Sequence, residues 1–487
     1  MSELLRKARE YEGVNRARVR DELPVFHVTG GIGWINDPNG FSAYGGEYHL
    51  FFQYYPYDVT WGPMHWGHVK TRDFVRWEFL PAALAPDEPY DKDGCFSGSA
   101  VETEDGQHVL LYTGVRKTEE GDEYQTQCVA FGDGTDYEKS PLNPVIDETL
   151  LPAGGSHVDF RDPKIWREDD MYYAVAANLL PEKRGAILLY TSEDALHWRA
   201  LGVLAGGEGK YGTMWECPDF FPLDGRHVLL HSAHEMRAEG LEFHAGDGTA
   251  CHIGRYDRES HRLEDEHVQT VDYGIDFYAP QTMEAADGRR VMIGWMQSWA
   301  ASRAVRTPLP FFGQMTVPRE LSIRGGRLCQ WPVRELEGFR RNRAAYQNVP
   351  VTDWQGFPGI AGRVLDLTLR VRPEKDAYRR FTVRVAEGDG LYTELTLLPQ
   401  EGIIRTDRTM SGLTEDVVHV REFPYDARGG ETELRIVMDK YSLELFVNGG
   451  EQAASMTLYT PLSADGIRFC ADGPVLLDAE KYDLVLD

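Results

Sequence analysis

Three acidic residues stand in short stretches of aromatic, turn-forming and polar residues, a setting in which a carboxylate can do chemistry. Asp37 lies in Gly-Trp-Ile-Asn-Asp-Pro-Asn-Gly, Asp162 in Phe-Arg-Asp-Pro, and Glu216 in Trp-Glu-Cys-Pro. Hydrolysis of a glycosidic bond needs an acid that protonates the leaving oxygen and a second carboxylate that acts as nucleophile or base. Taken singly, each residue is better explained by a turn, a surface ion pair or simple solvation. The catalytic interpretation therefore depends on whether the chain brings the three together.

The neighbours of these carboxylates indicate how the roles divide. Apolar neighbours of Glu216 would raise its pKa and favour the general acid. Amide donors around Asp37 would keep it ionised, which suits nucleophilic attack. Arg161 can pair with a carboxylate or bind hydroxyl groups through two hydrogen bonds. Several aromatic residues can stack on a sugar, although packing is the simpler explanation for any one of them: Trp34, Trp61, Trp66, Phe96, Trp215, Tyr278 and Trp295.

Short apolar runs recur along the first two thirds of the chain at nearly equal intervals. They begin at Tyr48, His108, Met171, His227 and Arg290, so the intervals lie between 56 and 63 residues. A fixed period of this length indicates one supersecondary unit repeated, as in the blades of a β-propeller. Accidental spacing in another β-rich protein is the alternative, and four nearly even intervals between five runs make it the weaker one.

A polar or aromatic stretch precedes each of these runs, and the three carboxylates stand in the first, third and fourth of these stretches. The second is Phe-Ser-Gly-Ser at 96–99, and the fifth is Asp-Phe-Tyr-Ala-Pro-Gln at 276–281. Equivalent positions in propeller blades are related by rotation about one axis. If these stretches are the innermost strands, Asp37, Asp162 and Glu216 meet in one central funnel.

The pattern changes after the fifth repeat. Residues 334–345 are charged and predict a short helical connector, whereas the chain beyond 349 alternates apolar and polar residues between Gly- and Asp-rich turns. Alternation with a period of two favours a β-sandwich. The expected domains are therefore an N-terminal lead-in at 1–25, a propeller at 26–335, a linker at 336–348 and a β-sandwich at 349–487.

Charge and cysteine usage limit the possible partners and the compartment. The formal net charge of −27 disfavours nucleic acid and anionic membranes. The N-terminus has no apolar core of the length that a signal peptide needs, and no run is long enough to span a membrane. The six cysteines are scattered and form no CxxC pair. We expect a soluble cytoplasmic protein without a metal; His65 and His68 lack a third ligand at useful spacing.

Taken together, these stretches resemble the signature blocks of glycoside hydrolase family 32. The blocks Trp34–Gly40, Phe96–Ser99, Phe160–Pro163, Trp215–Asp219 and Asp276–Gln281 occur in the family's order, and the resemblance extends from about His27 to Leu336. It continues more weakly through 443–449. Trp61–His68 and Asp91–Ser99 look most similar to bacterial intracellular sucrose or sucrose-6-phosphate hydrolases.

The resemblance implies an all-β fold, a five-bladed β-propeller followed by a C-terminal β-sandwich, with no metal or cofactor. It implies that Asp37 is the nucleophile, Asp162 the transition-state stabiliser and Glu216 the general acid/base of a retaining mechanism. It also implies a set of residues that line the fructosyl pocket: Trp34, Asn36, Gln53, Trp61, Phe96, Ser97, Arg161, Tyr278 and Trp295.

Substrate and assembly stay open at this level. The expected activity is release of β-D-fructofuranosyl units from sucrose, sucrose-6-phosphate or short fructo-oligosaccharides by a monomer or homodimer. The alternatives are a fructosyltransferase with the same covalent intermediate, a carbohydrate-binding protein with a degenerate site and, more remotely, an inverting propeller glycosidase. Segments 176–184, 234–244 and 299–306 depart from the pattern of the similar enzymes and concern the leaving group. Arg116, Lys117, Arg303 and Arg306 can contact a phosphate, but loop lysines and arginines are more often solvated.

Overall fold

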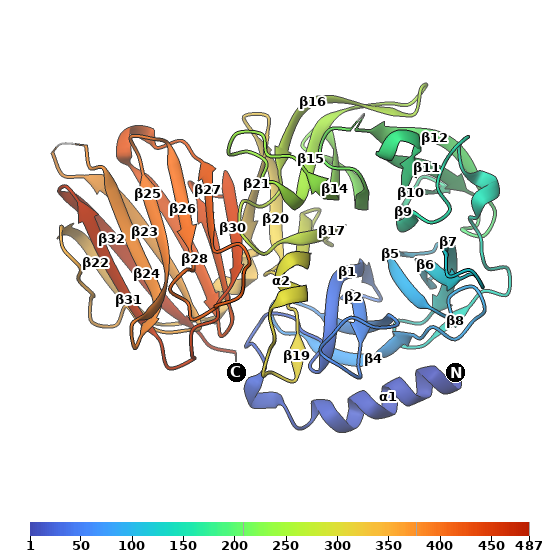
Figure 1. Cartoon of the computed structure of the whole chain (residues 1–487), viewed down its shortest axis with the longest axis horizontal. Coiled ribbons are helices and arrows are strands. Elements are labelled where there is room, and N and C mark those ends of the chain that lie inside the picture. The colour runs from blue at the N-terminus through green and yellow to red at the C-terminus, as the bar shows by residue number, and fades with distance from the viewer. Residues whose placement is uncertain (208, 376, 487) are drawn as a thin grey trace.

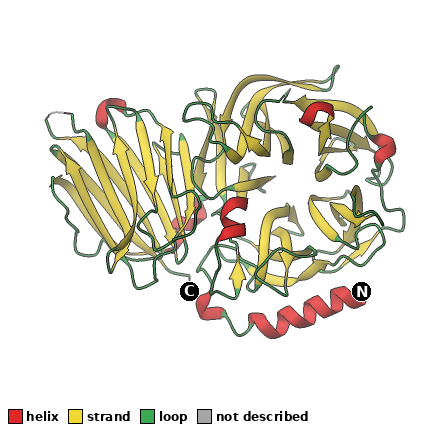
Figure 2. Cartoon of the chain, viewed as in Figure 1, coloured by secondary structure: helices red, strands yellow, loops and turns green. Residues whose placement is uncertain are grey.

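A computed structural model of the chain describes residues 1–207, 209–375 and 377–486. It shows a ring of five small sheets beside two larger packed sheets (Figure 1). Colouring by secondary structure shows how completely strands dominate both parts (Figure 2). The predicted all-β fold, a five-bladed propeller followed by a β-sandwich, is confirmed.

Each blade is an antiparallel sheet whose first strand along the chain lies toward the centre of the ring. Blades one and two contain β1 (Gly33–Tyr44), β2 (Glu47–Tyr55), β3 (His65–Thr71) and β4 (Glu78–Leu84), then β5 (Gly94–Glu102), β6 (His108–Lys117), β7 (Glu123–Gly132) and β8 (Tyr137–Lys139). Blade three contains β9 (Phe160–Glu168), β10 (Met171–Leu180), β11 (Arg184–Ser192) and β12 (Trp198–Gly206). Blade four contains β13 (Trp215–Leu223), β14 (Arg226–Met236), β15 (Gly246–Asp257) and β16 (Arg262–Thr270). Blade five contains β17 (Tyr278–Glu284), β18 (Arg290–Trp295), β20 (Arg319–Arg324) and β21 (Arg327–Pro332).

The ring closes through its first strands. β1 contacts β5 and β17, β9 contacts β5 and β13, and β13 contacts β17. The short strand β19 (Phe311–Phe312) adds to the inner edge of blade one in parallel with β1. The five predicted apolar runs all fall on the second strands β2, β6, β10, β14 and β18. These strands are apolar along most of their length because both of their faces are covered by neighbouring blades.

The C-terminal domain packs a six-stranded sheet on a five-stranded one. The first sheet contains β22 (Arg340–Val351), β32 (Val475–Leu484), β23 (Leu365–Pro373), β28 (Thr432–Asp439), β29 (Ser442–Val447) and β30 (Gln452–Thr457) in that order. The second contains β27 (Val420–Pro424), β26 (Ile403–Asp407), β25 (Leu391–Leu398), β24 (Arg380–Gly388) and β31 (Gly466–Asp472). Alternate side chains such as Leu365, Leu367, Leu369 and Val371 fill the space between the sheets.

The connector between the domains is shorter than the sequence indicated. The charged segment forms a 3-10 helix, η4 (Arg334–Phe339), and strand β22 starts directly after it at Arg340. Most of the expected linker at 336–348 is therefore a strand of the sandwich, in which Ala344 and Tyr346 pack on the core. The domain limits themselves stay a prediction.

Buried charges join the two domains. Arg319 of blade five is fully buried and pairs with Asp272 at 2.9 Å and with Glu444 of β29. His27, which precedes β1, lies between Asp439 at 3.1 Å and Glu444 at 3.0 Å. These contacts hold the sandwich against the fourth and fifth blades and the start of the first.

The helices are few and short in the part of the chain that the structure describes, apart from the N-terminal helix. They are α1 (Glu3–Arg16), α2 (Trp299–Ala304) and the 3-10 helices η1 (Arg20–Glu22), η2 (Glu148–Leu150), η3 (Pro181–Lys183) and η5 (Arg428–Gly430), besides η4. α1 lies along the outer strand β4 of blade one, with Leu5 packed against Ala82 and Ala85 (Figure 1). Within the described residues, no helix combines the length and the apolar character that crossing a membrane requires.

Candidate active site

Every innermost strand carries a β-bulge on a stretch that the sequence singled out, and β1 has a second one between Asn39 and Ser42. The bulges lie between Ile35 and Pro38, Phe96 and Gly98, Arg161 and Lys164, Glu216 and Asp219, and Tyr278 and Gln281. An extra residue in one strand bends it and turns a side chain out of the regular alternation. The five bulges face one axis, so the repeat turns equivalent side chains toward a common space.

At three of these bulges the backbone adopts a left-handed conformation. Asp162, Cys217 and Ala279 occupy equivalent places and have positive φ angles of 61°, 49° and 50°. At the bulge of the second blade, Gly98 leaves no room for a side chain, because a Cβ at this position would lie 2.1 Å from the carbonyl oxygen of Leu111. Strained backbone of this kind is often found where side chains are held for function.

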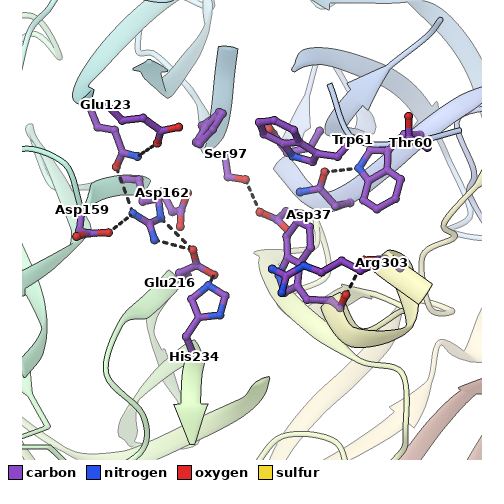
Figure 3. Close-up of a pocket in the computed structure, with 18 of the residues that line it drawn as sticks. Asp37, Thr60, Trp61, Ser97, Glu123, Asp159, Asp162, Glu216, His234 and Arg303 are labelled. Atoms are coloured by element: carbon purple, nitrogen blue, oxygen red, sulfur yellow. Dashed lines mark hydrogen bonds and ion pairs between the residues drawn. The ribbon is translucent and has the colours of Figure 1, made fainter. Parts of the chain in front are cut away.

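The bulges surround the base of a cavity of about 640 Å³. Figure 3 shows Asp37 reaching it from one side and Asp162 and Glu216 from the other. Ten of the predicted site residues line it: Trp34, Asn36, Asp37, Gln53, Trp61, Phe96, Ser97, Arg161, Asp162 and Glu216. Arg303 and Arg306, which the sequence analysis considered only as phosphate contacts, also line it. The sequence analysis gave no substrate-pocket role to the remaining lining residues: Thr60, Glu123, Gln125, Val158, Asp159, His234, Trp299 and Ser302.

Two predicted pocket residues lie behind the wall of the cavity. Tyr278 is buried, and its hydroxyl donates a 2.8 Å hydrogen bond to Oε2 of Glu216. Trp295 is fully buried and packs against Trp34 and Trp299, with ring centroids 6.0 Å and 5.1 Å apart. Since neither lines the cavity, both act on it through the side chains in front of them.

The lining residues without a predicted pocket role come mostly from the ends of second and third strands and from the connection that contains α2. Glu123 and Gln125 begin β7, His234 lies near the end of β14, and Trp299 begins α2. The repeat located the inner strands but gave no signal for these positions. The unusual composition of 234–244 and 299–306 was the only available indication.

Asp37 is buried where blades one, two and four meet. Its Oδ2 accepts a 2.6 Å hydrogen bond from Ser97 and lies 3.5 Å from the Sγ of Cys217. Burial raises its pKa, the Ser97 donor opposes this, and the charge of Glu216 adds to it. Oδ1 is buried and accepts no hydrogen bond from the described part of the chain.

Asp162 shares the same neighbourhood. Its Oδ2 accepts a 3.0 Å hydrogen bond from the backbone N–H of Cys217, and its own N–H donates to Thr113 at 2.9 Å. Burial and the negative charge of Glu216 raise the pKa of Asp162 to about 7, although Arg161 opposes the shift. Mutual repulsion keeps the three carboxyl groups from being fully ionised together.

Glu216 has a more polar environment than its sequence neighbours indicated. Arg161 donates to its Oε1 at 2.9 Å, and His234 and Tyr278 both approach its Oε2 at 2.8 Å. Burial alone would raise the pKa of Glu216, but Arg161, His234 and Tyr278 together hold it well below its ordinary value. The expectation of a pKa raised by apolar neighbours is wrong, because the fold brings two cationic side chains to this carboxylate.

The fold and the site together define a class of protein. Carboxylates from three blades of a propeller converge on a cavity with aromatic walls, Trp34, Trp61 and Phe96, that suit the apolar face of a sugar. This arrangement is typical of a glycosidase, in which paired carboxylates cleave a glycosidic bond.

Comparisons with known proteins identify the family. The model of the glycosyl hydrolases family 32 N-terminal domain matches residues 27–332, and that of the family 32 C-terminal domain matches residues 335–483. The chain belongs to glycoside hydrolase family 32. It is 34% identical to a sucrose-6-phosphate hydrolase of Zymomonas mobilis over 477 residues, covering 94% of this chain and 91% of the relative. It is 35% identical to a raffinose invertase of Escherichia coli over 464 residues, covering 92% of each.

A solved structure shows the same architecture. The GH32 beta-fructofuranosidase BmSUC1 of Bombyx mori matches with a TM-score of 0.84 at 34% sequence identity, covering 98% of this chain and 97% of the silkworm enzyme. A variant of that enzyme has been solved in complex with sucrose and matches with a TM-score of 0.83. The similarity therefore includes both domains and the connection between them.

Proposed function

We propose that this chain is a retaining β-fructofuranosidase that releases the fructosyl unit of sucrose or of a closely related small sugar. The observation that carries the proposal is the convergence of Asp37, Asp162 and Glu216 on one cavity from three bulged inner strands. Membership of family 32 and the names of the relatives support the choice of a fructosyl substrate.

In the proposed mechanism, Asp37 attacks C2 of the fructosyl unit while the glycosidic oxygen takes a proton from Glu216. The bond from C2 to that oxygen breaks, a bond from C2 to Asp37 forms, and the leaving sugar departs as an alcohol. Water then attacks C2, gives a proton to Glu216, and releases Asp37 as a carboxylate. The place of Asp37 in the lining of the cavity and the Ser97 donor that favours its ionised form support the nucleophilic role.

Asp162 is proposed to bind fructose hydroxyl groups, most strongly in the transition state. Its raised pKa supports this role, because a protonated carboxyl can donate to one hydroxyl and accept from another. Arg161 is proposed to hold Glu216 in place from the Oε1 side. Trp34, Trp61 and Phe96 are proposed to face the sugar, while Asn36, Gln53 and Ser97 provide polar contacts at the base of the cavity.

The choice between sucrose and its phosphate ester depends on the outer part of the cavity. Arg303 and Arg306 line it, and neither pairs with a carboxylate within the described residues. Unpaired arginines in a protein of net charge −27 favour an anionic group on the leaving sugar. Sucrose-6-phosphate is thus the second candidate substrate. All six cysteines carry free thiols, which supports a cytoplasmic location; that location and a monomeric or homodimeric state remain predictions.

The direct test compares kcat/KM for sucrose, sucrose-6-phosphate, kestose and inulin. We expect the highest values for the two disaccharides, and the complete loss of fructose release in Asp37→Asn and Glu216→Gln. Inertness of the wild-type protein toward all four sugars would contradict the proposal, and unchanged turnover in Asp37→Asn would contradict the assigned nucleophile. Oligosaccharides in excess of free fructose at high sucrose would instead indicate a fructosyltransferase.

A further inference from the structure

The imidazole of His234 connects two carboxylates of the fourth blade. Its Nε2 lies 2.8 Å from Oε2 of Glu216, and its Nδ1 lies 2.8 Å from Oδ1 of Asp247. Glu216 is on β13, His234 on β14 and Asp247 on β15, so the three side chains cross three neighbouring strands. Figure 3 shows the ring of His234 directly beside Glu216 at the edge of the cavity.

The register of the blade explains this alignment. Glu216 pairs with Ser232, and His234 follows two residues later, on the same face of β14. The backbone N–H of His234 donates to the carbonyl oxygen of Met214 at 3.1 Å, which fixes the strand at this point. The pairing of β14 with β15 shifts just beyond Ala233 and brings Asp247 to the other side of the ring. His234 is therefore held at both nitrogens by strands of its own sheet.

The charged and titratable groups around the ring favour its protonated form. Glu216 faces it from β13, Asp247 from β15 and Tyr278 from β17, while Arg161 of β9 contacts the far oxygen of Glu216. Burial favours the neutral ring, but the carboxylates of Glu216 and Asp247 outweigh it and raise the pKa of His234 to about 10. A proton therefore lies on Nε2, one hydrogen bond away from Oε2 of Glu216.

The contact between His234 and Glu216 explains how Glu216 can act as a general acid although its ionised form is favoured. A general acid needs a proton at the working pH, yet Arg161, His234 and Tyr278 together favour the ionised form of Glu216. The pair of His234 and Glu216 still holds that proton, because its loss from the ring leaves two partly buried carboxylates without their shared cation.

We propose that His234 is a positioning residue that stores the proton of the general acid Glu216, and that Asp247 keeps the ring oriented and charged for this task. The inference rests on the proposed function, in which Glu216 is the acid and base. In the first half of the reaction, the proton on Nε2 moves to Oε2 of Glu216 as Glu216 protonates the leaving oxygen. In the second half, Glu216 takes a proton from the attacking water and returns one to Nε2, so that the enzyme ends in its starting state.

The experiment compares two fructosyl donors in wild type, His234→Gln and Asp247→Asn. Sucrose has a leaving group that needs a proton, whereas β-D-fructofuranosyl fluoride has a leaving group that depends far less on acid catalysis. Glutamine can still donate a hydrogen bond to Glu216 but carries no transferable proton. His227→Gln is the matched control, because His227 lies at the far end of the same strand β14.

We expect kcat/KM for sucrose to fall about 100-fold in His234→Gln, with less than about a 10-fold loss for the fluoride. The alkaline limb of the sucrose profile should move to lower pH by at least about one unit in His234→Gln and by less in Asp247→Asn. Equal losses on both donors, or an unchanged alkaline limb, would overturn the inference while leaving the proposed function intact. Inactivity of the wild type on sucrose and on the fluoride would instead overturn the proposed function.

Discussion

The hydroxyl of Ser97 donates a 2.6 Å hydrogen bond to Oδ2 of Asp37. The bond connects β5 of blade two with β1 of blade one, so neighbouring blades determine the state of one carboxylate. Burial favours the protonated form of Asp37, and the Ser97 donor favours the ionised form that a nucleophile requires. Ser97 of the Phe-Ser-Gly-Ser block thus stabilises the form of Asp37 that the proposed nucleophilic attack requires.

Ser97→Ala should lower kcat for sucrose about 10- to 100-fold, since hydrogen bonds to charged groups are worth about 1.5–3 kcal/mol. The change removes a donor that lowers the pKa of Asp37, so the acidic limb of the kcat/KM profile should move to higher pH. Steady-state kinetics across the pH range measures both effects. Ser97→Thr retains the hydroxyl and should restore much of the activity. An acidic limb that stays in place in Ser97→Ala would show that the donor does not control Asp37.

The arginines of the outer cavity give a prediction about phosphate recognition. Arg306 donates to the carbonyl oxygen of Arg303 at 3.1 Å, so the two side chains belong to one local structure at the end of α2. Arg303→Gln and Arg306→Gln should lower kcat/KM for sucrose-6-phosphate about 10- to 100-fold and change that for sucrose by less than about 3-fold.

The control for this comparison is Arg184→Gln, at a half-buried position outside the cavity whose side chain contacts only the carbonyl oxygen of Pro181 among the hydrogen-bond partners described. It should leave both substrates unaffected. If Arg303→Gln and Arg306→Gln reduce hydrolysis of both disaccharides equally, the arginines shape the cavity without recognising a phosphate.

The sequence predicted the propeller and the convergence of the three carboxylates because both depend on a repeat. Asp37, Asp162 and Glu216 could be placed in one funnel because rotational equivalence follows from even spacing. The bulges were not predicted, although the Asn-Asp-Pro and Glu-Cys-Pro stretches lie on them, because a bulge depends on the register between two strands. Strand β22 was missed because its charged residues lie on the solvent face and conceal its alternation.

Contacts between segments that are far apart along the chain could not be predicted from the sequence. Trp295 is an aromatic residue of the kind that stacks on sugars, but its packing against Trp34 and Trp299 shows that it lies behind the wall of the cavity. His234 was noticed as part of an unusual segment, yet its approach to Glu216 depends on the pairing of β13 with β14. The charges of Arg161 and His234 together lower the pKa of Glu216, because neighbours in space and not neighbours in sequence determine a pKa.

Arg319 provides a test of the junction between the domains. The guanidinium is fully buried and contacts Asp272, Glu444 and Gln330. Arg319→Met keeps much of the volume but leaves the buried carboxylate of Asp272 without its cation and that of Glu444 with His27 alone, and we expect a loss of about 3–5 kcal/mol in the free energy of unfolding. Denaturant unfolding followed by fluorescence measures it. Arg334→Met breaks an exposed ion pair with Glu320 and should cost less than about 1 kcal/mol. Similar effects of the two substitutions would contradict the structural role of the buried network.

His27 makes the stability of the same junction depend on alkaline pH. Burial favours the neutral ring, but its hydrogen bonds to Asp439 and Glu444 outweigh it and raise the pKa of His27 to about 9. A pKa above the ordinary value of about 6.5 means that the stabilisation is complete below that pH and is lost as pH rises toward 9. The shift corresponds to about 3 kcal/mol.

His27→Gln keeps a polar side chain without a titrating ring, so the variant should be less stable than the wild type at low pH, and its loss of stability above pH 6.5 should be smaller. Denaturant unfolding of both proteins between about pH 6 and pH 9.5 provides the comparison. Parallel curves would assign the alkaline loss to other groups, whereas curves that converge toward high pH would assign it to His27.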